Sequence, residues 1–266
     1  MKPYKVSAKK PTMNLLLYGK PGVGKTVLAA TAKDHKDMQE ILFCNVEGGL
    51  LSVASADVLA VDIGKDDKGR LNGHVVQDLE KVFWAVMNKE PGFEKIQTVV
   101  IDSGSELQNI DLQNIVAEQC KTNPRRNNID DIWLEDYGKC TAKLLRVLRW
   151  FRDAPVNVII TALVKKVLPT TSDGLPRGVD VAPVEVMPQF TNKLGESLMG
   201  YMDFVWYYYQ DDEGKRCLLT QEKSIFRAKT RGIKFAEAIG DVVENPNLGH
   251  LYQTFLDNEL PGKGKK

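Results

Sequence analysis

A phosphate-binding loop is the clearest chemical pattern in the sequence. Residues 19–26 read Gly-Lys-Pro-Gly-Val-Gly-Lys-Thr and match G-x-x-x-x-G-K-[ST] at every constrained position, after an apolar run and before a helical segment. Glycines let successive backbone N–H groups curl around phosphates, Lys25 brings a positive charge to the β- and γ-phosphates, and the Thr26 hydroxyl is a Mg²⁺ ligand. We therefore expect ATP and Mg²⁺ as cofactors, with the nucleotide held by Gly19, Lys20, Pro21, Gly22, Val23, Gly24, Lys25 and Thr26.

Two carboxylates are placed to complete this site. Asp102 ends the apolar run 98–102, where it could join Thr26 in holding Mg²⁺, with Ser103 helping to orient a metal-bound water. Glu47 directly follows the apolar run 41–46 and is our candidate for the group that positions or deprotonates the attacking water. Both acids would lie at the carboxyl edge of a parallel sheet, where ligands of such sheets bind. The alternative for Glu47 is a solvated or helix-capping acid.

Strands and helices alternate along the first two thirds of the chain. Apolar runs of strand length cover residues 14–18, 41–46, 57–63, 98–102 and 156–163, and helical patterns cover 25–33, 74–88, 105–120 and 133–153. Strands that are apolar on both faces predict a mostly parallel sheet with helices on both sides. Residues 201–210 and 215–222, joined by the turn 211–214, predict an antiparallel hairpin. The expected fold class is α/β, with this hairpin at the C-terminal end.

The composition is that of an ordinary globular protein. Of 266 residues, 43% are hydrophobic and 27% charged, and the net charge of +1 leaves any nucleic-acid contact to local patches. The four cysteines show no metal-ligand spacing, which favours a reducing compartment. No apolar stretch approaches the roughly twenty residues of a membrane span. We expect a cytoplasmic protein without membrane contact.

The chain divides into four expected segments. Residues 1–11 form a basic N-terminal segment, 12–245 an ATPase domain, 246–260 a C-terminal helix and 261–266 a disordered Lys/Gly tail. Two polar stretches, 121–131 and 165–188, lack a clear period and are expected to be loops.

Three of these segments together with the phosphate-binding loop resemble the ATPase core of the RecA family. Residues 43–50 look like its strand and catalytic glutamate, 98–103 like its Walker B strand, and 158–162 like the strand that senses the γ-phosphate. The order of these segments is most similar to phage-encoded RecA-core ATPases of single-strand annealing and recombination. The resemblance covers residues 13–231. Where RecA has a polar sensor near the end of its fourth strand, this chain offers only Thr161. RecA's polymerisation helix and C-terminal domain have no counterpart, which leaves the mode of assembly open.

The resemblance implies partners as well as a RecA-like fold. RecA-type proteins bind ATP between subunits, which suggests a homo-oligomer, either ring or filament, and makes Lys229 and Arg231 candidate catalytic cations supplied by a neighbour. A basic strand end is the alternative for these two residues. Single-stranded DNA is the expected polymer partner, with a single-stranded-DNA-binding protein as a further one. The candidate DNA contacts are Lys121, Arg125 and Arg126 in the first loop and Lys165, Lys166 and Arg177 in the second.

A basic stripe on the predicted helix 133–153 gives a third place for DNA. It contains Lys139, Lys143, Arg146, Arg149 and Arg152, whose spacing puts them on one face. Such a stripe is usually only the solvated side of a helix.

Three functions remain open from the sequence. The first is a DNA-stimulated ATPase of recombination or strand annealing, located in the host cytoplasm if it is phage-encoded. The second is a nucleotide or small-molecule kinase, which the single arginine of segment 165–188 argues against, because such kinases carry arginine-rich lids. The third is a nucleotide-gated helicase loader or recombination mediator. In those functions that include ATP hydrolysis, Lys25, Glu47 and Asp102 are the expected catalytic residues.

Overall fold

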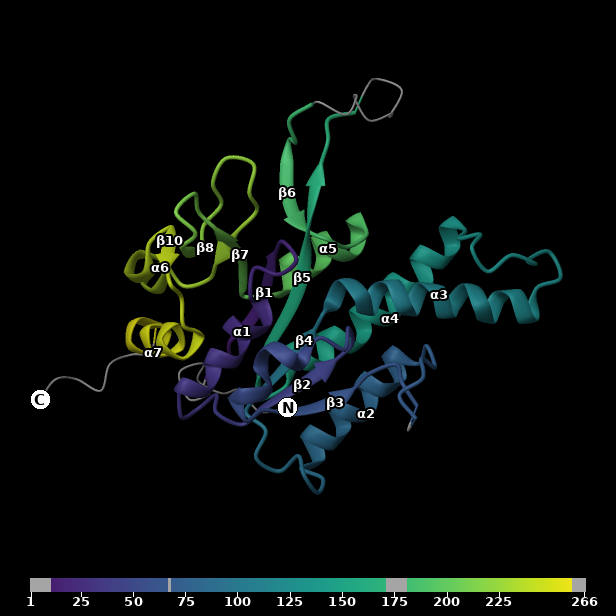
Figure 1. Cartoon of the computed structure of the whole chain (residues 1–266), viewed down its shortest axis with the longest axis horizontal. Helices are drawn as coiled ribbons and strands as arrows, with labels where there is room; N and C mark the ends of the chain where they lie inside the picture. The colour runs from purple at the N-terminus through teal and green to yellow at the C-terminus, as the bar shows by residue number, and fades with distance from the viewer. Residues whose placement is uncertain (1–10, 67, 171–180, 260–266) are drawn as a thin grey trace, which may run out of the picture.

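A single ten-stranded sheet runs through the part of the chain that the computed structural model describes, residues 11–66, 68–170 and 181–259 (Figure 1). Its order is β10-β8-β7-β1-β5-β4-β2-β3, with β6 added to β5 and β9 added to β7. The strands are β1 Asn14–Gly19, β2 Ile41–Asn45, β3 Leu59–Asp62, β4 Thr98–Asp102, β5 Asn157–Val167, β6 Glu185–Pro188, β7 Phe204–Gln210, β8 Arg216–Leu219, β9 Lys229–Thr230 and β10 Val242–Glu244.

The centre of the sheet is parallel and its C-terminal end is antiparallel. From β3 through β2, β4, β5 and β1 to β7, every neighbouring pair is parallel. β8 then pairs antiparallel with β7, and β10 antiparallel with β8. The expected fold class is therefore confirmed. Because parallel strands end at the same edge, the carboxyl ends of β1, β2, β4 and β5 share one side of the sheet.

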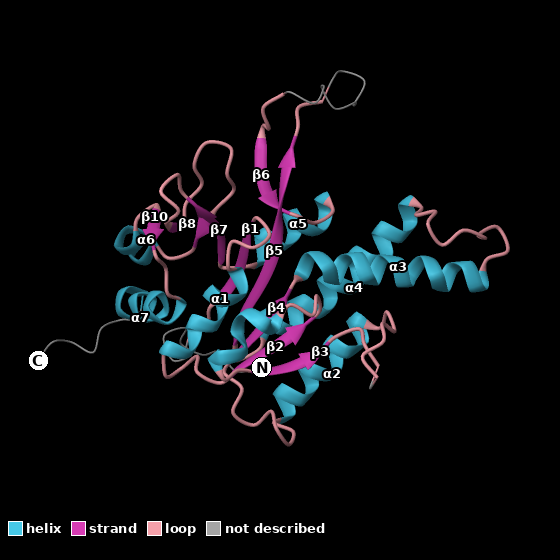
Figure 2. Ribbon diagram, in the orientation of Figure 1, coloured by secondary structure: helices cyan, strands magenta, loops and turns pink. Residues whose placement is uncertain are grey.

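Helices cover both faces of the sheet (Figure 2). They are α1 Lys25–Ala30, α2 Val75–Asn88, α3 Gly104–Thr122, α4 Leu134–Asp153, α5 Asn192–Tyr201, α6 Ile233–Ile239 and α7 Leu248–Glu259, together with the 3₁₀ turns η2 Thr31–Asp34 and η3 Leu50–Ala56. In the described ranges, none of these helices is both long and apolar enough to cross a membrane.

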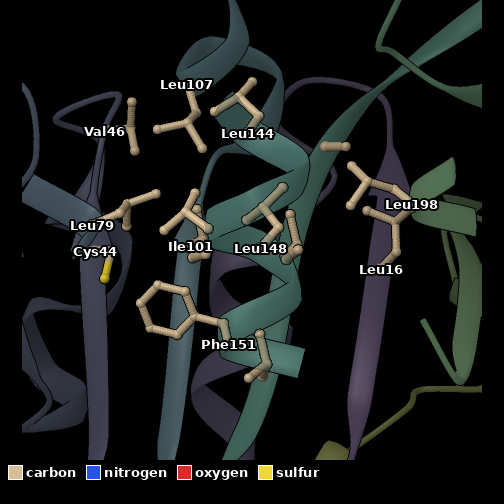
Figure 3. Close-up of a cluster of buried hydrophobic side chains, with 14 of the residues drawn as sticks. Leu16, Cys44, Val46, Leu79, Ile101, Leu107, Leu144, Leu148, Phe151 and Leu198 are labelled. Atoms are coloured by element: carbon tan, nitrogen blue, oxygen red, sulfur yellow. The ribbon is translucent and has the colours of Figure 1, made fainter. Parts of the chain in front are cut away.

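Each face of the sheet has its own apolar core. Successive side chains of β1 point to opposite faces, so Leu16 joins one core and Leu15 the other. The first core packs the sheet against α2, α3, α4 and α5, and Figure 3 shows Leu148 and Phe151 of α4 over Ile101 of β4. The second core lies under α1, α6 and α7. Burial on both faces explains the uninterrupted apolar runs of the central strands.

The stretch 165–188, expected to be a loop, begins and ends as strand. β5 continues past Leu163 to Val167 and pairs antiparallel with β6, which forms an arm beyond the sheet edge (Figure 1). The prediction was wrong here because β6 is stabilised by a distant segment: the Val186 N–H donates to the Ile225 carbonyl at 2.7 Å, and the Arg227 N–H to the Val186 carbonyl at 3.0 Å. No local periodicity records such pairing.

Other element boundaries in the structure also differ from those predicted from the sequence. α3 extends to Thr122, so Lys121 is helical rather than part of a loop. The expected strand 201–210 starts only at Phe204, because α5 ends at Tyr201. The expected helix 25–33 is α1 followed by η2. The N-terminal segment up to residue 10 and the tail 261–266 lie outside the described residues.

α7 packs closely against the turn that follows α1. The Leu248 N–H donates to the Thr31 hydroxyl at 2.8 Å, and the Asn247 amide to the Asp34 carboxylate at 2.6 Å. A β-carbon at Gly249 would lie 2.9 Å from the His35 backbone nitrogen. The backbones of the two elements are therefore in contact, and this contact braces α1 and the loop before it.

We expect Gly249→Ala to destabilise the protein by about 1–3 kcal/mol, because the added methyl meets backbone atoms that must shift. Gly138→Ala is the matched control: Gly138 lies within α4, and a β-carbon there has no neighbour within 4 Å. This change should stabilise the protein by up to about 1 kcal/mol through helix propensity. Urea denaturation followed by circular dichroism measures both, and equal effects would contradict the close packing.

Candidate active site

The phosphate-binding loop joins β1 to α1 at the carboxyl edge of the sheet. Two glycines shape it. A β-carbon at Gly19 would lie 2.2 Å from the Tyr208 carbonyl oxygen, so only glycine lets β1 lie this close to β7. Gly24, directly before α1, has a φ of 99°, which side chains rarely allow. The loop geometry therefore depends on residues of the motif itself.

Lys25 closes this loop from the inside. Its ammonium group donates to the carbonyl oxygens of Gly19 at 3.1 Å and Lys20 at 3.0 Å, and the residue is buried. Burial lowers the pKa of Lys25, while the nearby negative charges of Asp102 and Glu47 act in the opposite direction. An additional anion beside the ammonium group would offset its cost of burial, and a polyphosphate supplies such a charge.

Asp102 connects three elements around the loop. Its carboxylate accepts a hydrogen bond from the Thr26 hydroxyl of α1 at 2.7 Å and another from the Thr161 hydroxyl of β5. Asp102 ends β4, and its side chain is buried beside Lys25. The structure thus brings Thr161 and both expected metal ligands to one point. The Asp102–Ser103 peptide bond is cis.

Glu47 is fixed next to this point by β2 and Ser103. The Val46 N–H donates to the Asp102 carbonyl at 2.9 Å, which holds the chain after β2 against the end of β4. The Glu47 carboxylate accepts a hydrogen bond from the Ser103 hydroxyl, while the residue as a whole is exposed. Its carboxylate is therefore oriented by the protein and open to water. Ser103 positions Glu47, a contact that the sequence did not predict.

The donor set suits Mg²⁺ brought in with a nucleotide. Thr26 and Asp102 supply a hydroxyl and a carboxylate at hydrogen-bonding distance, and oxygen ligands of this kind, completed by phosphates and waters, are what Mg²⁺ prefers. Among the described residues there is no cluster of three or more His, Cys, Asp or Glu side chains that could hold a metal by themselves. The geometry fits a metal held jointly by protein and nucleotide.

A family model described as AAA domain (AAA_24) matches residues 12–232. The chain belongs to this family. Such domains are P-loop ATPases that bind ATP, generally with Mg²⁺, and this supports ATP binding and hydrolysis by the chain. A comparison with curated proteins gave no match. The matched range nearly coincides with residues 13–231, over which the RecA-type resemblance was found.

Lys229 and Arg231 of the AAA domain do not join the site of their own chain. β9 pairs with the start of β7, and that start lies beside Leu15, at the end of the sheet opposite the phosphate-binding loop. The half-buried Lys229 donates to the Met199 carbonyl, and Arg231 forms an ion pair with Asp203 at 2.6 Å. Burial lowers the pKa of Lys229, and the charge of Arg231 adds to this. Their action in trans stays a prediction.

Arg126 corrects the expected set of DNA contacts. Its guanidinium forms an ion pair with Asp136 at 2.7 Å and lies 4.0 Å above the Trp133 ring. Both charged side chains are buried. Burial alone would raise the pKa of Asp136, but hydrogen bonds from Arg126 and from the Trp133 N–H lower it overall. Arg126 therefore holds the α3–α4 connection together and does not face solvent.

The remaining candidate DNA contacts lie in two separate places. Lys121 and Arg125 are exposed at the far end of the α3–α4 pair, whose helices extend side by side away from the sheet (Figure 1). Lys166 is exposed on the β5–β6 arm, and the partly buried Lys165 donates to the Asn192 side chain at 2.7 Å. Arg177 lies outside the described residues.

The basic stripe of α4 is used mainly for contacts within the chain. Lys143 pairs with Asp111 at 2.7 Å, Arg146 with Glu80 at 2.5 Å, and Arg152 with its neighbour Asp153. Arg149 packs over the Tyr201 ring. This network joins α4 to α2, α3 and α5, which favours the structural reading of the stripe.

Two features beside the phosphate-binding loop were not predicted from the sequence. A cavity of about 670 Å³ opens between residues 20–23 and the aromatic rings of Tyr207, Tyr209 and Phe226. On the opposite face of β7 and β8, the Arg216 guanidinium lies beside Gly24. Both come from chain segments far from the motif, and no spacing rule links them to it.

We expect Arg126→Ala to destabilise the protein by about 3 kcal/mol, because it leaves Asp136 buried without its partner. The expected loss is at the low end for a broken buried ion pair, because this pair lies near the tip of the α3–α4 helix pair. Urea denaturation measures the loss. Since the pKa of Asp136 is lowered in the fold, its stabilising contribution is present at neutral pH and is lost as pH falls through that lowered value.

Arg125→Ala, at the exposed neighbouring residue, is the control and should stay within about 0.5 kcal/mol of the wild type. A stable Arg126→Ala protein that loses only DNA affinity would show that the ion pair is not the role of this residue.

Proposed function

We propose that the protein is a RecA-like ATPase that acts on single-stranded DNA in recombination or strand annealing, as an oligomer with ATP at subunit interfaces. The observation that carries this proposal is the convergence of Lys25, Thr26, Asp102 and Glu47 at one sheet edge, from which the β5–β6 arm projects. The first feature provides ATP hydrolysis, and the second a means to couple it to a polymer.

A single strand links the two features. Thr161, which donates to Asp102, and Lys165 and Lys166 of the arm all belong to β5. A change at Asp102 on binding or loss of the γ-phosphate would therefore act on the strand that carries the arm. Order changes driven by the γ-phosphate and its metal are a known switching device in P-loop proteins.

The oligomeric part of the proposal follows from the position of the second pair of cations. Lys229 and Arg231 lie at the sheet end opposite their own phosphate-binding loop, so the γ-phosphate they would contact belongs to a neighbouring subunit. To do so, Arg231 would exchange its ion pair with Asp203 for the phosphate. A cation supplied in this way stabilises the charge of the phosphoryl-transfer transition state.

Glu47→Gln tests the hydrolytic site. Loss of the carboxylate that positions water should lower kcat by about 10²- to 10⁴-fold while leaving ATP binding intact. The matched control is Glu40→Gln, since Glu40 is exposed at the opposite end of the same strand and should leave kcat unchanged. Phosphate release measures kcat, and fluorescent-nucleotide titration measures binding. A Glu47→Gln protein with normal turnover would remove Glu47 from the mechanism.

The DNA part of the proposal is tested with the double variant Lys165→Ala/Lys166→Ala. If both lysines contact phosphates, single-strand affinity falls and the slope of log Kobs against log[salt] decreases by about 1.4. The control is Lys89→Ala/Lys95→Ala, which removes equal charge from exposed positions at the amino edge of the sheet. Fluorescence anisotropy across a salt series gives both values.

The same proteins are assayed for ATPase activity with and without single-stranded DNA. Stimulation that is present in the wild type and lost only in the arm variant supports the proposal. A wild-type rate that DNA does not change, together with no DNA retention, would contradict it and favour a loader or mediator role.

A further inference from the structure

Arg216 is the first residue of β8 and lies against the phosphate-binding loop. It pairs across the hairpin with Gln210, two residues beyond Tyr208 of β7, which lies beside Gly19 of β1. A β-carbon built on Gly24 would lie 3.5 Å from its Cζ atom and 3.6 Å from its Nε and Nη2 atoms. The whole guanidinium plane therefore faces the last glycine of the loop.

Within the described part of the chain, this guanidinium has no carboxylate partner. No ion pair or side-chain hydrogen bond involves it anywhere in the described ranges, and the residue is exposed. Neighbouring cations of the same region behave differently: Lys215 pairs with Glu244 at 2.8 Å, and Arg227 with Glu185 at 2.5 Å. Glu244, on the neighbouring strand β10, is thus used by Lys215, and no described residue accepts a hydrogen bond from the Arg216 guanidinium.

The charges around the loop are arranged asymmetrically. Asp102 and Glu47 lie on the side of β4 and β2, where they act on Lys25 and where Thr26 and Asp102 could hold Mg²⁺. Arg216 lies on the β8 side, and β7, β1 and β5 separate β8 from the strands that carry those carboxylates. A polyphosphate in the loop would have the metal on one side and an unpaired guanidinium on the other.

We propose that Arg216 binds phosphate oxygens of the nucleotide held in the loop of its own subunit. Guanidinium groups present planar pairs of N–H donors that match phosphate oxygens, and such charge-assisted hydrogen bonds are stronger than neutral ones. This assignment rests on the proposed ATP site and adds a second cation from the same chain to Lys25. It differs from Lys229 and Arg231, which would act only on a neighbour's nucleotide.

The test compares Arg216→Ala with Arg216→Lys and with Lys215→Ala, the adjacent exposed cation that is already paired. Two ligands are titrated into each protein: ATP, and inorganic tripolyphosphate, which has phosphates but no base or ribose. We expect Arg216→Ala to weaken both ligands by about tenfold, the equivalent of one charge-assisted hydrogen bond. Arg216→Lys should recover part of the loss, and Lys215→Ala should bind as the wild type does.

The two ligands separate the possible failures. Wild-type affinity of Arg216→Ala for both would overturn the assignment while leaving the ATPase intact. A loss for ATP but none for tripolyphosphate would also overturn it, since the guanidinium would then contact base or ribose. Failure of the wild-type chain to bind either ligand would remove the ATP site itself. Thermal melting without ligand checks the fold of each variant, and Arg216→Lys carries the test if the alanine variant melts early.

Discussion

The carboxylate of Asp102 is the constraint around which the active site is arranged. It accepts hydroxyl hydrogen bonds from Thr26 and Thr161, so it fixes α1 and β5 relative to β4. The parallel order β1-β5-β4-β2 makes this possible, because it brings the ends of four strands to one edge. A buried carboxylate that accepts hydrogen bonds from two hydroxyls is held in one orientation, so the two candidate metal ligands, Thr26 and Asp102, and Thr161 are positioned together.

The cationic side chains discussed above fall into two groups: those that form an ion pair with a carboxylate, and those that do not. Arg126, Arg227 and Arg231 all pair with carboxylates of their own chain. Lys25 is buried near two carboxylates but bonds only to backbone carbonyls. Arg216 has no carboxylate partner among the residues that the structure describes. A polyanionic ligand in the phosphate-binding loop would stabilise the charged form of such unpaired cations, because the ligand supplies the missing negative charge.

β5 belongs both to the central sheet and to the arm. Its first half is buried between β1 and β4, and its second half leaves the sheet to form the arm with β6. The pairing of β6 with the segment around Phe226, and the hydrogen bonds from the Tyr18 hydroxyl to the Val186 and Arg227 carbonyls, tie the arm to the strand that leads into the phosphate-binding loop. The nucleotide site and the arm are thus connected along β5 and through Tyr18.

The sequence by itself determined the loop 19–26, the strand ending at Asp102 and the parallel sheet, because each depends on residues that are neighbours in the chain. It also placed Glu47 at the sheet edge, since a strand's end follows from its apolar run. Only the tertiary structure decided that Arg126 is buried, that β6 pairs with β5 and that Arg216 reaches Gly24. Those facts depend on partners that are adjacent only after folding, and local spacing carries no record of which charges will meet.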